Sequence, residues 1–269
     1  MAREGRAWAC PADASDPGDH AMRSLPLELD EGFLFVHLPE GRFLVDTGSP
    51  ASFGDVPSAT FGASPHPIPR SLNGFGMEDV RVLVHGPCAG LLGMDVLGSS
   101  RILFDLPGRR IVVGHDAWDD SPAGDRRPVQ ARVVGGFAIT IDVDCGGSRA
   151  GVIFDTGSRY CYTMDPALVQ HGVKVEDLDD YNPILGRLRS PSWNVDFSIV
   201  GDRGPALFHS DRMGLLGGAA LGPMAVLGQA FGVSGLVGNR WMSRARIGLD
   251  AAAARGNEVL WLAEARAMA

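Results

Sequence analysis

Short apolar runs separated by glycine, proline and polar residues dominate the hydrophobic pattern of this chain. Apolar and polar positions alternate in segments such as 81–84 (Arg-Val-Leu-Val) and 137–143 (Phe-Ala-Ile-Thr-Ile-Asp-Val), which is typical of half-buried β-strands. Candidate helices are few, at 95–99, at 166–171 and within 213–231. The pattern predicts a mainly β protein with few short helices.

One block of this pattern occurs twice. Residues 43–49 (Phe-Leu-Val-Asp-Thr-Gly-Ser) and 152–158 (Val-Ile-Phe-Asp-Thr-Gly-Ser) each place an apolar strand before Asp-Thr-Gly-Ser. Leu91-Leu92-Gly93 and Leu236-Val237-Gly238 follow them, and an arginine and an aspartate then stand at matched distances from each glycine (Arg101 and Asp105; Arg246 and Asp250). Because whole blocks repeat in order, the sequence predicts two duplicated β-lobes. We expect the matched Asp105 and Asp250 to be turn or surface residues.

The boundary between the two copies is a polar, turn-rich stretch. We expect a flexible N-terminal segment at 1–24, an N-terminal lobe at 25–115, a linker at 116–128 and a C-terminal lobe at 129–269.

Composition and charge narrow the function classes. The 269 residues carry a net charge of -8 and no basic run, so a nucleic-acid partner is not expected. The uncharged stretch at 213–238 contains Pro223 and many glycines, which favours a buried segment over a membrane span. No apolar segment follows the early arginines, so we expect a cytoplasmic protein whose four cysteines are free thiols rather than a Cys145–Cys161 bridge.

The doubled motif resembles the pepsin family of aspartic peptidases and its half-size relatives, the retropepsins, in the motif blocks at 43–49, 91–93, 152–158 and 236–238. The resemblance implies a bilobal pepsin-like fold in which Asp46 and Asp155 form a catalytic carboxylate pair. It gives supporting roles to the residues that complete the two motifs, which are Thr47, Gly48, Ser49, Thr156, Gly157 and Ser158. The threonines are expected to bond across to the opposite loop, the glycines to bring their N–H groups near the carboxylates, and the serines to donate to the outer carboxylate oxygens.

Two carboxyl groups held this close share one proton, a behaviour for which aspartic proteases are themselves the reference case. The ionised member can activate a water that attacks a peptide carbonyl, and this chemistry requires no metal and no cofactor. We expect an aspartic endopeptidase that acts as a monomer on a peptide or protein. Two alternatives remain open: a peptide-binding module, or a different acid–base reaction on a peptide or natural product.

The cover of the cleft departs from the family pattern. Pepsin-like enzymes close the cleft with a first-lobe hairpin flap that usually carries a tyrosine, but all three tyrosines here lie in the second half. The best candidate flap tip is Asn73-Gly74-Phe75-Gly76, with Phe75 in the place of the usual aromatic residue and a shortened return strand. We expect an apolar hairpin of the second lobe, at 193–208 and including Trp193, to cover the cleft as well.

Overall fold

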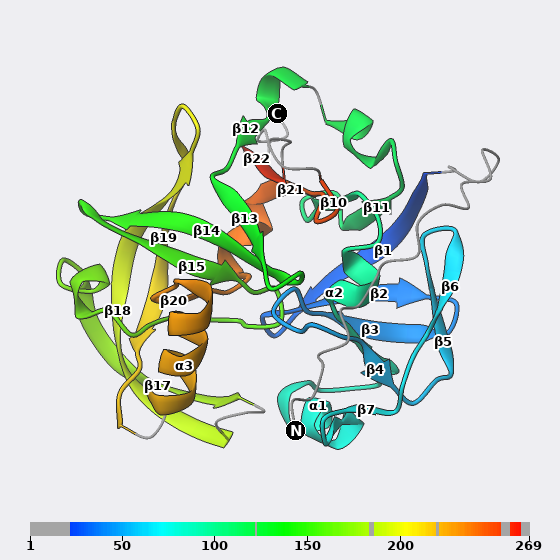
Figure 1. Ribbon diagram of the computed structural model, residues 1–269, viewed down its shortest axis with the longest axis horizontal. Coiled ribbons are helices and arrows are strands. Elements are labelled where there is room, and N and C mark those ends of the chain that lie inside the picture. Colours follow the sequence, from blue (N-terminus) through cyan, green and yellow to red (C-terminus); the bar gives the residue numbers. More distant parts are fainter. Residues whose placement is uncertain (1–21, 122, 183–185, 219–220, 254–258, 265–269) are drawn as a thin grey trace, which may run out of the picture.

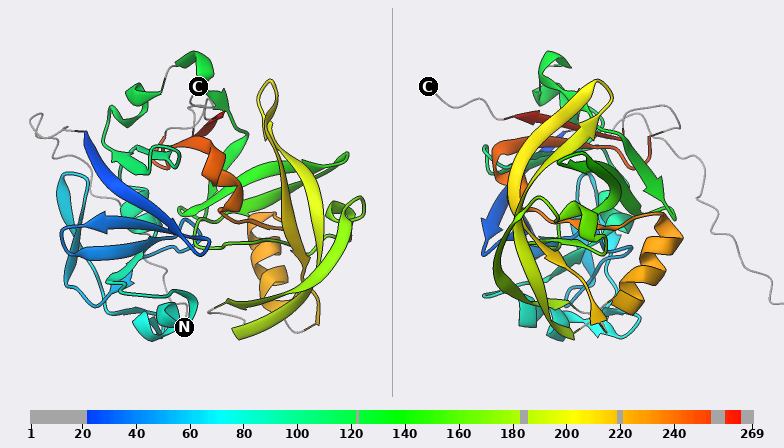
Figure 2. Two further views of the ribbon diagram at one scale, coloured as in Figure 1. Left: turned by 180° about the vertical axis from the view of Figure 1, so that it is seen from behind. Right: turned by 90° about the vertical axis from the view of Figure 1, so that its left-hand side faces the viewer.

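The computed structural model describes residues 22–121, 123–182, 186–218, 221–253 and 259–264, and it shows a mainly β molecule with two lobes (Figure 1). The first half (blue to cyan) and the second half (green to orange) lie side by side, and strands drawn in orange and red lie between them (Figures 1 and 2).

The elements of the first half are short, as expected from its frequent turn residues. In chain order they are β1 (Arg23–Asp30), β2 (Phe33–Leu38), β3 (Gly41–Val45), β4 (Phe53–Gly54), β5 (Ser58–Phe61), β6 (Ser64–Pro67), β7 (Ser71–Leu72), β8 (Phe75–Gly76), α1 (Met77–Leu83), β9 (Gly90–Leu92), α2 (Met94–Leu97), β10 (Ile102–Asp105) and β11 (Arg110–Val113). Two 3₁₀ turns, η1 (Ala117–Asp120) and η2 (Ala123–Asp125), lead into the second half.

The second half contains three longer strands that form a wide antiparallel ribbon, β17 to β19. Its elements are β12 (Arg127–Pro128), β13 (Ala131–Val134), β14 (Ala138–Cys145), β15 (Ser148–Phe154), β16 (Cys161–Thr163), η3 (Pro166–Leu168), β17 (Val173–Asn182), β18 (Gly186–Gly201), β19 (Gly204–Leu215), α3 (Leu221–Phe231), β20 (Gly235–Val237), η5 (Arg240–Arg244), β21 (Ala245–Leu249) and β22 (Leu260–Glu264).

The repeated sequence blocks form the same substructure in both halves. The strand before the first aspartate, β3, pairs in parallel with β9, and the strand before the second, β15, pairs in parallel with β20. The backbone N–H of Asp46 donates to Leu92 and that of Asp155 donates to Val237, both at 3.0 Å. Each aspartate therefore stands at the end of a buried strand, fixed by the neighbouring apolar-apolar-Gly block.

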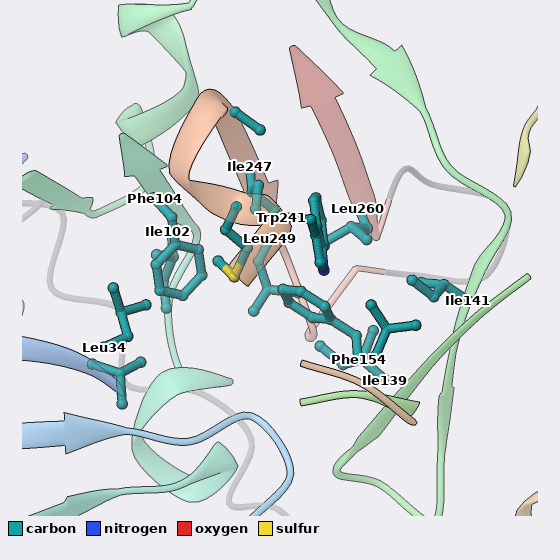
Figure 3. Packing of buried hydrophobic residues seen from close by; sticks show 14 of the residues in the cluster. Leu34, Ile102, Phe104, Ile139, Ile141, Phe154, Trp241, Ile247, Leu249 and Leu260 are labelled. Carbon is teal, nitrogen blue, oxygen red and sulfur yellow. The ribbon is translucent and has the colours of Figure 1, made fainter. Parts of the chain in front are cut away.

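A shared sheet joins the halves. Strands β10 and β11 of the first half and β21 and β22 of the second belong to one ten-stranded sheet, in which β10 pairs antiparallel with β21. One hydrophobic cluster runs through this junction, where Phe104 and Ile102 of the first half lie near Trp241, Ile247 and Leu249 of the second (Figure 3).

The prediction that Asp105 is a turn or surface residue is wrong. Its side chain is 1% exposed, and the register of the junction places it opposite Arg246, whose Nε lies 3.1 Å from the Asp105 carboxylate. Arg110 binds the other carboxylate oxygen at 3.1 Å. The matched pair, Arg101 and Asp250, forms a second ion pair across the same junction at 3.1 Å. The repeated arginines and aspartates thus connect the two halves.

The helices agree only in part with the sequence pattern. α2, η3 and α3 overlap the predicted segments, although 213–215 belong to β19. The predicted strand at 81–84 is wrong, because most of it forms α1. An Asp79 carboxylate that accepts the Gly76 N–H caps this helix, and the buried Met77, Val80 and Val84 fit helical spacing as well as the alternation fits a strand.

Over the described residues, none of the helices has the length and apolar character to cross a membrane. Cys88, Cys145 and Cys161 are free thiols, as predicted, and Cys10 lies outside the described residues.

Candidate active site

The two Asp-Thr-Gly-Ser loops hold their aspartates in the same way. Oδ1 of Asp46 accepts the backbone N–H groups of Gly48 at 2.9 Å and Ser49 at 3.0 Å. Oδ1 of Asp155 accepts those of Gly157 at 2.9 Å and Ser158 at 3.2 Å. Each carboxyl group is thereby fixed by two donors of its own loop before any ligand arrives.

The serine hydroxyl groups do not take their predicted role. The Ser49 hydroxyl donates to the carbonyl of Ala51 at 2.8 Å, and the Ser158 hydroxyl donates to the carbonyl of Tyr160 at 2.9 Å. In both loops the hydroxyl donates a hydrogen bond to the carbonyl two residues ahead, which closes a local turn. The serines contact the carboxylates through their backbone N–H groups instead.

The two threonines tie the loops together, as the sequence predicts. The Thr47 hydroxyl donates to the carbonyl of Phe154 at 2.7 Å and accepts the N–H of Thr156 at 3.0 Å. The Thr156 hydroxyl donates to the carbonyl of Val45 at 2.8 Å and accepts the N–H of Thr47 at 3.0 Å. Both side chains are fully buried, so four crossed hydrogen bonds fix the relative position of the two aspartates.

The glycines of the motifs are required by close approach. A Cβ atom at Gly48 would lie 2.6 Å from the carboxyl carbon of Asp155, and one at Gly157 would lie 2.3 Å from that of Asp46. Any side chain at either position would push the carboxyl groups apart. Each carboxyl group therefore packs against the glycine backbone of the other loop.

The two carboxyl groups lie close together, each against the glycine of the opposite loop, so the charge of one affects the pKa of the other. Burial raises the pKa of Asp46 well above its ordinary value, and the charge of Asp155 raises that pKa further. Burial also raises the pKa of Asp155, against the hydrogen bonds from Gly157 and Ser158, which favour its ionised form. The pair consequently holds one proton at pH values where an isolated carboxyl group is ionised.

A cleft of about 340 Å³ opens over this pair, within the size range of small-ligand sites. Residues of both halves line it, and most of them are apolar. On the first-half side they include Phe33, Leu44, Phe53, Leu72, Phe75, Val80 and Leu83, and on the second-half side Ile153, Tyr162, Tyr181, Leu188, Leu216 and Leu236. Asp46 and Asp155 thus lie at an apolar, partly enclosed surface.

The predicted flap tip is a very short hairpin. β7 and β8 pair over two residues each, and Asn73 and Gly74 form the turn with φ of 49° and 92°. Phe75 lines the cleft, but Gly74 has open space around it and Gly76 precedes α1. Helix α1 takes the place of a longer return strand and adds Val80 and Leu83 to the wall.

The prediction that the hairpin at 193–208 covers the cleft is wrong. Of β18 it is Leu188, near the start of the strand, that lines the cleft, and Trp193 is five residues further along, about 16 Å away in a strand. The Trp193 ring packs against the large core, with the Lys174 ammonium 5.9 Å from its centre. The tip between β18 and β19 (yellow, top of Figure 1) lies at the opposite end of the molecule from α1.

Sequence reasoning missed a polar group in the wall of the cleft. Arg159, Tyr162 and Asp180 all line it, and the Tyr162 hydroxyl donates to Asp180 at 2.7 Å. Arg159 directly follows the second motif, which was the only available signal. The partner Asp180 could not be recognised before the position of β17 was known.

No family model matches the sequence, and no curated protein matches it. Among solved structures, the basic 7S globulin from soybean is similar over 90% of this chain and 94% of that chain, with a TM-score of 0.53 and 10% sequence identity. At this identity the similarity concerns the fold, which is a bilobal, mainly β, pepsin-like fold.

Proposed function

We propose that this protein is an aspartic endopeptidase that hydrolyses peptide bonds with a water activated between Asp46 and Asp155. The observation that carries the proposal is the carboxyl pair itself. Two half-buried carboxyl groups face one cleft, each packs against the glycine of the opposite loop, and each is held by two N–H donors of its own loop. A pair that holds one proton provides an acid and a base at one place.

In the proposed reaction, the ionised carboxylate takes a proton from a water bound between the two groups. The oxygen of this water forms a bond to the peptide carbonyl carbon, while the protonated carboxyl group gives its proton to the carbonyl oxygen, whose π bond to carbon breaks. The product of this step is a tetrahedral intermediate, and the proton has moved from one side of the pair to the other.

Breakdown of the intermediate returns the pair to its starting state. The carbon–nitrogen bond breaks as the amine nitrogen takes the proton that the first carboxylate removed from water. The other carboxylate takes a proton back from one hydroxyl of the intermediate, whose C=O bond re-forms, and the new carboxyl group leaves with the water oxygen. The crossed threonine bonds support this cycle because they keep the two carboxyl groups in place while the charge moves.

The walls of the cleft support a peptide substrate. Apolar side chains from both halves surround the pair, and Phe75 and α1 cover it from the first half. An apolar cover lowers the local dielectric constant and so favours the shared proton. The monomeric state and the cytoplasmic location predicted from the sequence remain predictions.

Digestion of a diverse synthetic peptide pool in H₂¹⁸O, from pH 4 to 8, tests the proposal by mass spectrometry. We expect cleavage products with one ¹⁸O in each new terminal carboxyl group, and no cleavage by Asp46→Asn. Asp179→Asn is the matched control, because Asp179 is an exposed aspartate paired with Arg187. Products formed equally by Asp46→Asn would overturn the proposal. Peptides that bind to the protein but remain uncut would indicate the alternative function, a peptide-binding module.

A further inference from the structure

Arg159 is a cation in the wall of a cleft whose other charged lining residues are acidic. It lines the same space as Asp46 and Asp155, four residues after the second aspartate, and its side chain is 30% exposed. Its Nε is buried and has no hydrogen-bond partner among the described residues. A guanidinium group has five N–H donors and cannot lose its charge in a protein, so these donors require an acceptor.

The one acidic partner that Arg159 has among the described residues holds it weakly. The distance from its terminal nitrogen to Oδ1 of Asp180 is 3.5 Å, at the outer limit of a hydrogen bond. The other oxygen of Asp180, Oδ2, accepts a hydrogen bond from the Tyr162 hydroxyl, with 2.7 Å between the two oxygen atoms. Burial and the charge of Asp180 raise the pKa of Tyr162, so this donor stays protonated. Asp180 is thus occupied by Tyr162 and leaves most of the guanidinium donors free.

Neighbouring side chains nevertheless fix the position of Arg159. The guanidinium carbon lies 5.4 Å from the centre of the Phe33 ring and 5.1 Å from that of Tyr160. The turn at Gly32 packs against the start of the side chain, since a Cβ at Gly32 would lie 3.0 Å from Cβ of Arg159. Because contacts with two aromatic rings already restrict the guanidinium group, it loses little conformational entropy when it binds a ligand, as in preorganised sites.

We infer that Arg159 is a specificity residue that binds a carboxylate of the peptide substrate, either an acidic side chain or the C-terminal carboxylate. This inference rests on the proposed function. A carboxylate matches the planar donor pattern of the guanidinium group. The negative charge of the aspartate pair repels such a group, so the carboxylate binds in a neighbouring subsite next to Arg159, and not at the reacting bond.

Four synthetic peptide pools of matched sequence separate the two sources of the carboxylate. They combine Asp and Glu, or Asn and Gln in their place, with a free or an amidated C-terminus. We expect the wild type to cleave one carboxylate-containing pool at least about tenfold faster than its neutral counterpart, the usual effect of a charge-assisted hydrogen bond. Arg159→Gln should reduce this ratio to near one, whereas Arg187→Gln, on an exposed residue of β18, should keep it. An equal ratio in wild type and Arg159→Gln, or no preference in the wild type, would overturn the inference.

Two further measurements keep the result unambiguous. If Arg159→Gln does not fold, Arg159→Lys serves in its place, because lysine keeps the charge but lacks the planar donors. The ratio of cleavage rates between the carboxylate-containing and the neutral pool should then fall but stay above one. An unchanged ratio would contradict the inference. Retention of the same pools on immobilised Asp155→Asn protein, with and without Arg159→Gln, measures carboxylate binding without hydrolysis. Absence of cleavage together with Arg159-dependent retention would reject the proposed peptidase but keep this site. Cleavage without any carboxylate preference would support the proposed peptidase but reject this site.

Discussion

Opposing effects act on each aspartate of the pair. The loop N–H groups stabilise the ionised form of both carboxyl groups, while burial destabilises it. The charge of Asp155 raises the pKa of Asp46 further, so burial and charge act in the same direction on Asp46. The raised pKa values, which the proposed acid–base chemistry uses, also reduce the stability of the folded chain at neutral pH.

This cost predicts how Asp46→Asn changes stability with pH. The folded pKa of Asp46 lies above its unfolded value of about 3.9, so the folded state binds more protons in between, and stability falls as pH rises through the folded pKa. Asparagine removes the titration. Denaturant unfolding from pH 4 to 8 should show the variant gaining stability relative to wild type as pH rises. A difference that shrinks with rising pH would contradict the raised pKa.

The crossed hydrogen bonds of Thr47 predict how its substitution changes the free energy of unfolding. Thr47→Ala leaves the buried carbonyl of Phe154 and N–H of Thr156 without partners, which should cost roughly 2–4 kcal/mol of unfolding free energy. Thr47→Ser keeps the hydroxyl and should lose much less. Equal losses in the two variants, measured by urea unfolding, would show that the methyl group and not the crossed hydrogen bonds stabilises the junction.

Among the elements, the β7–β8 hairpin and α1 form the first-half cover of the cleft with Phe75, Val80 and Leu83, whereas β18 contributes Leu188 and the segment at 193–208 contributes no lining residue. A hairpin of two-residue strands has little stability of its own, so the buried face of α1 against Phe33, Phe53 and Leu91 must hold the cover in place.

This division predicts contrasting effects for two aromatic residues. Phe75→Ala should lower kcat/KM roughly tenfold or more, because the side chain lines the cleft and its apolar contact with substrate is lost. Trp193→Ala removes a ring that packs against the core elsewhere, so it should lower stability but leave kcat/KM of the folded protein within about twofold. Steady-state kinetics on one cleaved peptide compare them. A larger loss of kcat/KM in Trp193→Ala than in Phe75→Ala would indicate that the second half covers the cleft.

At the scale of the whole molecule, the ion pairs across the β10–β21 junction hold the halves in register. Asp105 is buried between Arg110 and Arg246, so losing one arginine still leaves it paired. We expect Arg110→Met and Arg246→Met each to cost about 1 kcal/mol of unfolding free energy. The double variant should cost about 3–5 kcal/mol, since it leaves an uncompensated buried carboxylate. Additive losses in a double-mutant cycle would show that the two arginines act independently.

The sequence was sufficient where interactions are local or repeated. The repeated Asp-Thr-Gly-Ser blocks predicted two duplicated β-lobes, and the resemblance that they carry implied the crossed threonine bonds and the approach of the glycine N–H groups. Sequence reasoning failed where two local readings were equally good, as at 81–84, whose alternation also fits the buried face of α1.

Long-range partners account for the other differences. The burial of Asp105 depends on Arg246, 141 residues away, and the position of Trp193 depends on how far β18 extends beyond the cleft. The role of Arg159 depends on Asp180 and Phe33, which only the folded chain brings to it. No local pattern encodes these contacts.

The central claim is that Asp46 and Asp155 work as one unit, and the kinetics of three variants test it most directly. We would measure kcat/KM on one cleaved peptide for wild type, Asp46→Asn, Asp155→Asn and the double variant. Each single variant should lose about a thousandfold or more, and the double variant should lose no more than either single, because residues that act as a unit are strongly non-additive. A single variant with near wild-type kcat/KM, or losses that multiply in the double variant, would contradict the account.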